Sequence, residues 1–194
     1  VTNAGGVGVL GAVGFTPEQL EVELEWIDER VGDRPYGVDV IIPNKYQDQN
    51  EKDPEKLQAL IASAIPQGHR DFARELLDAH GVPPLPEDKR VGDRLSMTEA
   101  TSAPLVDVAL RHENVRLIAN ALGTPPPEII KQIQDSGRMV GALCGTARHA
   151  LKHAEAGLDF VVAQGGEGGG HTGEIGSSVL WPEVVDVVGS VPVI

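Results

Sequence analysis

The chain has 194 residues, 41% of them hydrophobic, and 29 acidic against 16 basic residues give it a formal net charge of −13. Such a chain can bury a hydrophobic core, but it lacks the clustered lysine and arginine that binding to nucleic acid or to an anionic membrane requires. We therefore expect a globular protein that binds neither. The single cysteine, Cys144, excludes an intramolecular disulfide and favours a cytoplasmic protein. It lies in an apolar run, where a buried and inert thiol is the expected state.

Apolar runs of strand length alternate with helical patterns along most of the chain. In chain order, strands are predicted at residues 7–13, 36–42, 115–122, 139–144, 159–163 and 191–194. Because these runs are continuously apolar rather than alternating, they predict an α/β fold in which a parallel sheet is covered by helices. A closed (β/α) TIM barrel needs about 250 residues. We therefore expect a barrel of this type that is incomplete, with about six of its eight strands present.

The first predicted helix begins at a capping box, with Thr16 as the N-cap, Pro17 at the first helical position and Gln19 three residues after the cap. Further helices are predicted at residues 127–134, 147–156 and 182–188. His149 and His153 are one turn apart, a metal-ligand spacing, but no third ligand accompanies them. We therefore interpret both as surface histidines and expect no metal. Three other histidines lie in polar surroundings and are expected to be solvated: His69, His80 and His112.

A long polar segment at residues 44–98 interrupts the alternation. It contains two helical patterns, at residues 54–62 and 72–77, followed by a proline-rich stretch. Because it follows the carboxyl end of a strand, it would lie over the edge of the sheet where barrel enzymes carry their sites, in the position of a lid. A surface excursion without a functional role explains the same pattern equally well.

A glycine-rich loop at residues 164–176 follows the fifth predicted strand, with the sequence QGGEGGGHTGEIG. Glycine lets the main chain lie against a flat or anionic ligand, and a single imidazole, that of His171, stands among the glycines. Gln164 and Glu167 flank them closely. Loops at strand ends carry the functional sites of α/β proteins, so the sequence predicts a site here.

Two segments together resemble the nitronate monooxygenases, formerly called 2-nitropropane dioxygenases: residues 3–11 (NAGGVGVLG) and residues 163–173 (AQGGEGGGHTG). The resemblance covers nearly the whole chain outside the insertion. It implies a flavoprotein with an FMN-binding β/α barrel. It also implies oxidation of alkyl nitronates or nitroalkanes by O2 to a carbonyl compound and nitrite, without a nicotinamide cofactor. The small-molecule partners would then be a nitronate and O2, and a homo-oligomer is left open.

In this family the histidine of the glycine loop acts as a base on the nitroalkane and lines the flavin, which implies that His171 is catalytic. An imidazole titrates near neutrality, so it suits this proton transfer. The amide of Gln164, at the end of its strand, suits the edge of the isoalloxazine ring. The full set of residues predicted to contact the flavin is Asn3, Ala4, Asn120, Thr146, Gln164, Gly169 and Gly170.

The resemblance also implies two elements that this sequence lacks. In such barrels the phosphate is held by loops after the last two strands, and the chain ends before them; the first barrel strand is missing as well. We therefore expect the 194 residues alone to be inactive and colourless, and a longer parent protein to be yellow. Two alternatives stay open. One is a flavin-dependent enoyl-ACP reductase, which has a similar glycine-histidine loop and uses NADPH. The other is a flavin-free degenerate barrel or binding scaffold.

Overall fold

The computed structural model describes residues 1–42, 56, 63–84 and 99–194. The chain divides into two compact units, one formed by Val1–Tyr46 with Ser96–Ile194 and the other by Gln47–Leu95. The second unit contains α3 (Gln67–Ala79), which includes the helical pattern predicted at residues 72–77. Apart from Lys56, the helix predicted at residues 54–62 lies outside the described residues.

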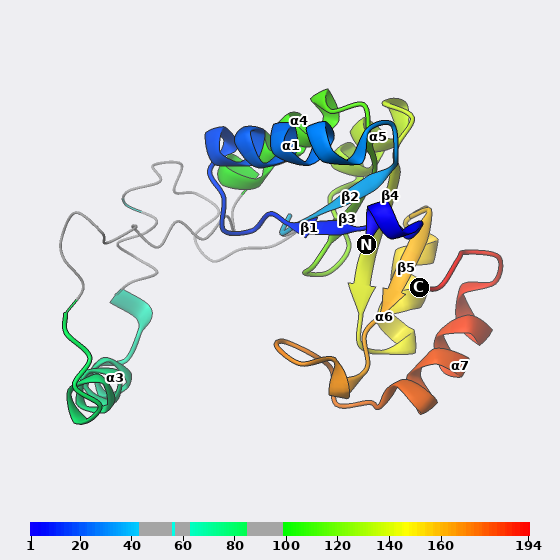
Figure 1. The fold of residues 1–194 in the computed structure, drawn as a ribbon. Helices are drawn as coiled ribbons and strands as arrows, with labels where there is room; N and C mark the ends of the chain where they lie inside the picture. The colour runs from blue at the N-terminus through cyan, green and yellow to red at the C-terminus, as the bar shows by residue number, and fades with distance from the viewer. Residues whose placement is uncertain (43–55, 57–62, 85–98) are drawn as a thin grey trace. The chain divides into compact units, whose positions relative to one another are not determined.

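A parallel five-stranded sheet forms the centre of the first unit (Figure 1). Its strands are β1 (Val9–Gly11), β2 (Tyr36–Val40), β3 (Val115–Asn120), β4 (Met139–Cys144) and β5 (Phe160–Ala163). They pair in sequence order, β1-β2-β3-β4-β5, which is the strand order of a β/α barrel and confirms the predicted fold class. The sixth predicted strand contributes a parallel bridge between Val161 and Val193.

The helices of this unit follow the strands as expected, with two differences. They are α1 (Pro17–Val31), α4 (Glu99–Arg111), α5 (Pro127–Asp135), α6 (Ala147–Glu155) and α7 (Ser177–Val188). The sequence pattern did not reveal α4, because Pro104 lies inside it and usually breaks a helix. The second difference is that α7 begins five residues before the predicted start and includes Pro182.

The capping box at the start of α1 forms as predicted. The hydroxyl of Thr16 accepts a hydrogen bond from the main-chain amide of Gln19 at 3.3 Å, and the Gln19 side-chain oxygen accepts from the Thr16 amide at 2.9 Å. The buried residues of this helix, Leu20, Leu24 and Val31, pack in the main hydrophobic core together with residues of β2, β3 and β4. In Figure 1, α1 and α4 lie side by side over the sheet.

The other face of the sheet carries a smaller apolar cluster of Leu117, Ala119 and Phe160. Two glycines on neighbouring strands make room for it. A side chain at Gly37 would overlap Leu117, and one at Gly141 would overlap the ring of Phe160. Leu117 and Phe160 therefore fit on this face because the neighbouring strands have glycine at the positions beside them.

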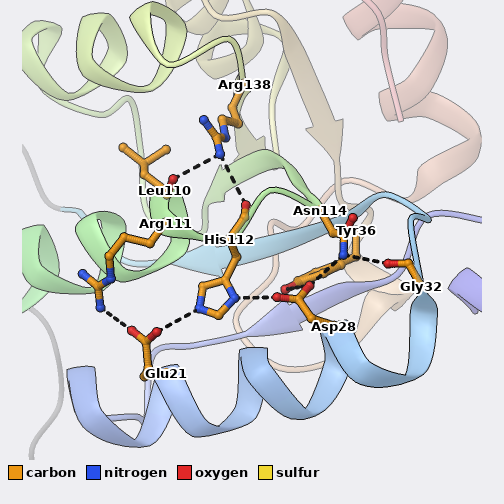
Figure 2. Close-up of polar contacts among 9 residues, drawn as sticks. All are labelled: Glu21, Asp28, Gly32, Tyr36, Leu110, Arg111, His112, Asn114 and Arg138. Atoms are coloured by element: carbon orange, nitrogen blue, oxygen red, sulfur yellow. Dashed lines mark hydrogen bonds and ion pairs between the residues drawn. The ribbon is translucent and has the colours of Figure 1, made fainter.

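A polar cluster ties α1 to the segment that precedes β3 (Figure 2). Asp28 accepts hydrogen bonds from Tyr36 and Asn114, each at 3.0 Å, and lies 2.6 Å from Nδ1 of His112. The other ring nitrogen of His112 is 3.4 Å from Glu21. His112 is only 7% exposed, so the expectation that it is solvated was wrong: the carboxylates that surround it belong to a helix more than eighty residues away in sequence.

Candidate active site

The glycine-rich loop leaves β5 and folds back on itself. The amide of Gly166 donates to the carbonyl of Ile175 at 2.8 Å, and the amide of Gly168 donates to Gly165 at 2.9 Å. The hydroxyl of Thr172 donates to the carbonyl of Gly166 at 3.2 Å. Figure 1 shows this segment in orange, beyond the arrowheads of β4 and β5. The loop is thus a folded structure at the carboxyl edge of the sheet, which is where the sequence predicted a site.

Glu167 anchors the loop to α7. Both of its carboxylate oxygens accept from the amide of Ser177, at 2.9 and 3.1 Å. Hydrogen bonds from its own main chain and from Ser177 lower the pKa of Glu167. A methyl group at Gly165 would lie 2.6 Å from the Ser177 nitrogen, so glycine is needed for this close approach. The anchor also explains why α7 begins at Ser177: its first amide receives an acceptor from the preceding loop.

A cavity of about 380 Å³ lies beside the loop, at the carboxyl ends of β3, β4 and β5. Its volume falls in the range of small-molecule sites. The residues that line it come from the end of β4, from the segments following these three strands and from α6: Ala121, Leu122, Gly123, Thr124, Leu143, Cys144, Gly145, His149, Lys152, His153, Gln164, His171 and Gly173. Burial raises the pKa of the Cys144 thiol to about 11, so this residue lines the cavity as a neutral and unreactive group.

The cavity brings together two of the predicted site residues, Gln164 and His171. The imidazole of His171 is exposed, and the Gln164 amide nitrogen lies 3.5 Å from the carbonyl of Gly169. Gly169 and Gly170 have φ angles of 78° and 68°, and nothing lies within 4 Å of the positions where their Cβ atoms would be. Bare main chain therefore faces open space at this part of the loop.

Two further predicted residues lie beside the cavity but have structural partners. Thr146 caps α6, because its hydroxyl accepts from the amide of His149 at 3.2 Å. Asn120 is 1% exposed, and its side chain bonds the main chain of Ile42, Leu122 and Gly123. Leu122 and Gly123 line the cavity, so Asn120 holds one of its walls. A contact of either side chain with a flavin stays a prediction.

Asn3 and Ala4 lie at the opposite edge of the sheet from Gln164 and His171. They precede β1 in a short 3₁₀ helix, and the Asn3 amide donates to the carbonyl of Arg30, in the last turn of α1, at 3.0 Å. In a parallel sheet these positions belong to the amino ends of the strands. A contact of Asn3 or Ala4 with the flavin ring stays a prediction.

His153 is a buried part of the cavity wall, so its interpretation as a surface histidine was wrong. It is 2% exposed, with Nε2 at 3.1 Å from the carbonyl of Leu143 and Nδ1 at 2.9 Å from the hydroxyl of Thr124. A carbonyl only accepts, so Nε2 carries the proton and the hydroxyl donates to Nδ1. Burial lowers the pKa of His153, which keeps it neutral. Its partners are 10 and 29 residues away, where helical periodicity gives no signal.

Asp39 is a second residue that the sequence did not single out as functional. Side chains alternate along a strand, so Asp39 lies on the same face of the sheet as Gly37, the face that carries Leu117 and Phe160. Burial raises the pKa of Asp39 to about 6. One of its carboxyl oxygens is buried without a hydrogen-bond partner among the described residues. An unpaired buried oxygen is costly, so a polar group of a ligand on this face would stabilise it.

These features fit a flavin. A flat conjugated ring needs a surface free of side chains, an apolar wall and a few hydrogen-bonding groups. Gly169 and Gly170 provide a surface free of side chains, and Leu122 and Leu143 line the cavity with apolar atoms. The Gln164 amide on the cavity wall can hydrogen-bond the ring, whereas Asp39, with its unpaired buried oxygen, is not among the residues that line this cavity. Among the described residues no group of histidine, cysteine, aspartate and glutamate forms a candidate metal site.

Comparison with solved structures places the chain among α/β proteins of the TIM-barrel type. Nitroalkane oxidase from Streptomyces ansochromogenes matches with a TM-score of 0.70 at 24% identity, over 100% of this chain and 51% of that one. FabK from Thermotoga maritima matches with a TM-score of 0.63 at 22% identity, over 100% of this chain and 43% of that one. At these identities the matches show the fold alone. No helix in the described parts is long and apolar enough to cross a membrane.

The family follows from the sequence comparison. The family model described as nitronate monooxygenase matches residues 1–194, and the chain belongs to this family. A Mycobacterium tuberculosis protein named "Putative monooxygenase Rv1533" is 47% identical over 100% of this chain and 52% of its own length. A Staphylococcus aureus protein named "Probable nitronate monooxygenase" is 26% identical over 100% of this chain and 51% of its own length.

Another relative matches part of the chain. A Rhodococcus jostii protein named as a hydroxy-methyl-oxo-octahydro-indene-carboxyl-CoA dehydrogenase is 38% identical over 55% of this chain and 30% of its own length. The chain spans about half the length of the relatives that match it from end to end.

Proposed function

We propose that the whole protein is an FMN-dependent nitronate monooxygenase, which oxidises alkyl nitronates or nitroalkanes with O2 to a carbonyl compound and nitrite. The observation that carries the proposal is the shared position of His171 and Gln164 on one cavity at the carboxyl edge of a parallel sheet, in a chain of this family. Bound FMN would supply the electron acceptor and pass the electrons on to O2.

His171 acts as the base in this proposal. A nitro group acidifies the carbon that bears it, and an imidazole beside the cavity can take the proton from that carbon. Gly170, next to His171, keeps the loop free of side chains that would compete for the same space. A nitronate has already lost this proton, so its oxidation needs no base. His171 should therefore matter much more for a nitroalkane than for the corresponding nitronate.

The ring of the cofactor would lie against the bare main chain of Gly169 and Gly170. Gln164 would hydrogen-bond its polar edge, and the apolar wall would exclude water.

The test compares His171→Gln with the wild-type whole protein on nitroethane and on ethyl nitronate, with nitrite release as the readout. We expect kcat/KM to fall by a factor of about 10²–10⁴ for nitroethane, the usual contribution of a general base, and to change little for the nitronate. Equal losses on both substrates would contradict the role of His171. No nitrite from either substrate with the wild-type protein would contradict the function.

Rapid reduction of the flavin by NADPH would instead favour the enoyl-reductase alternative. A protein that neither contains flavin nor gains stability from added FMN would favour the scaffold alternative.

A further inference from the structure

Lys152 places a positive charge on the wall of the cavity. The protein has a formal net charge of −13, yet no carboxylate is among the residues that line the cavity. The titratable groups there are Cys144 and three histidines, together with Lys152. In an acidic protein, a local cation at a concave surface attracts anionic ligands.

Lys152 and His149 form one patch on this wall. They are three residues apart on α6, so they occupy the same side of the helix, and both are exposed. Within the described ranges, neither has a carboxylate at ion-pair distance. On α5, by contrast, the exposed Lys131 contacts Asp135 at 2.7 Å.

The helix that carries this patch is firmly fixed to the sheet. His153, one residue after Lys152, bonds the carbonyl of Leu143 in β4 and the hydroxyl of Thr124. At its other end α6 is capped by Thr146. Its amino end, with a partial positive charge, is next to Gly145 on the same cavity. Lys152 and His149 therefore project from a support that is held at both ends.

We propose that Lys152 and His149 form a subsite for an anionic group of the substrate, a carboxylate or a phosphate, at the end remote from the carbon that His171 deprotonates. The role of His171 rests on the proposed function, whereas the anion subsite does not. Two kinds of substrate carry such a group: short nitro acids, with a carboxylate, and coenzyme A thioesters, with phosphates. The subsite recognises the charge that they share.

The kinetic test uses two nitronates of similar size, one with a carboxylate tail (propionate 3-nitronate) and one with a neutral tail (butyl 1-nitronate). In the flavin-loaded whole protein, Lys152→Met should raise KM for the carboxylated substrate about three- to fivefold, the effect of one partly exposed ion pair. Neither kcat nor the KM of the neutral substrate should change. Lys152→Arg should retain the wild-type preference, and added salt should weaken it. Lys131→Met, which removes the same charge from α5, is the matched control.

A binding test separates this inference from the proposed function. Titration calorimetry with succinate and with coenzyme A measures affinity without turnover. Weaker binding of either ligand to Lys152→Met, with wild-type affinity in Lys131→Met, supports the subsite even if no nitronate is oxidised. The ligand that binds more tightly identifies the source of the anion. Unchanged dissociation constants and an unchanged KM ratio in Lys152→Met would overturn the subsite, even if the protein oxidises nitronates.

Discussion

Replacing Asp39 by asparagine should stabilise the protein at neutral pH. Burial raises the pKa of Asp39 from 3.8 to about 6, which corresponds to ~3 kcal/mol at most. Part of the carboxyl group remains accessible to water, and solvent screening reduces this figure to ~1.5 kcal/mol. Asparagine keeps the shape of the side chain and removes the charge.

The pH dependence follows from the direction of the shift. Between pH 4 and pH 6 the folded protein keeps the Asp39 proton while the unfolded chain releases it, so stability is lost as the pH rises through this window. Because Asp39→Asn escapes this loss, its advantage should be small at pH 4 and reach ~1.5 kcal/mol at pH 7.5.

The assay is urea unfolding of both proteins at the two pH values, with Asp186→Asn, an exposed carboxylate on α7, as the control. An equal effect of Asp39→Asn at pH 4 and pH 7.5, or a loss of stability at pH 7.5, would refute the reasoning. A gain in stability with weaker flavin binding would fit a carboxyl group that is retained for ligand binding.

Three other predictions concern the supports of the site. Gly165→Ala should lower the free energy of unfolding by about 1–3 kcal/mol because its methyl group would press on the Ser177 amide; an unchanged urea midpoint would argue against the tight loop. His153→Phe should cost about 1–3 kcal/mol in thermal unfolding, since it removes both hydrogen bonds of a buried imidazole, whereas His153→Gln should retain part of the stability. Burial raises the pKa of Asp28, but hydrogen bonds from His112, Asn114 and Tyr36 outweigh it, so that the pKa is lowered. Because Asp28→Asn loses these bonds to a carboxylate, it should destabilise the protein at pH 7 by about 1.5–3 kcal/mol. That deficit should shrink as acid protonates the wild-type carboxylate below about pH 4, and a deficit that is the same at pH 3 and pH 7 would contradict it.

Local signals predicted much of the fold. The capping box at Thr16 fixed the start of α1, and the run at residues 139–144 matched β4 to the residue, because both depend on neighbours in sequence. The sequence pattern failed to predict an element where a residue distant in sequence determines it. The start of α7 depends on Glu167, ten residues before it, and α4 forms despite Pro104 because its apolar residues are buried in the core.

The site was predictable in part for the same reason. The glycine loop and His171 are contiguous and follow a strand, so their place at the carboxyl edge follows from the sequence. His153 and Asp39 looked ordinary, because their burial arises only when the strands pair. Asn3 was assigned by resemblance without regard to the strand end it occupies, and its contact with the flavin stays a prediction.

The most direct test of the proposed function is the visible absorption spectrum of the whole protein, recorded anaerobically before and after addition of a nitronate. The account predicts an oxidised flavin spectrum that bleaches when the nitronate is added and returns when O2 is admitted. A flavin that stays oxidised in the presence of nitronate would contradict the proposed reaction, and a protein without flavin would contradict the cofactor as well.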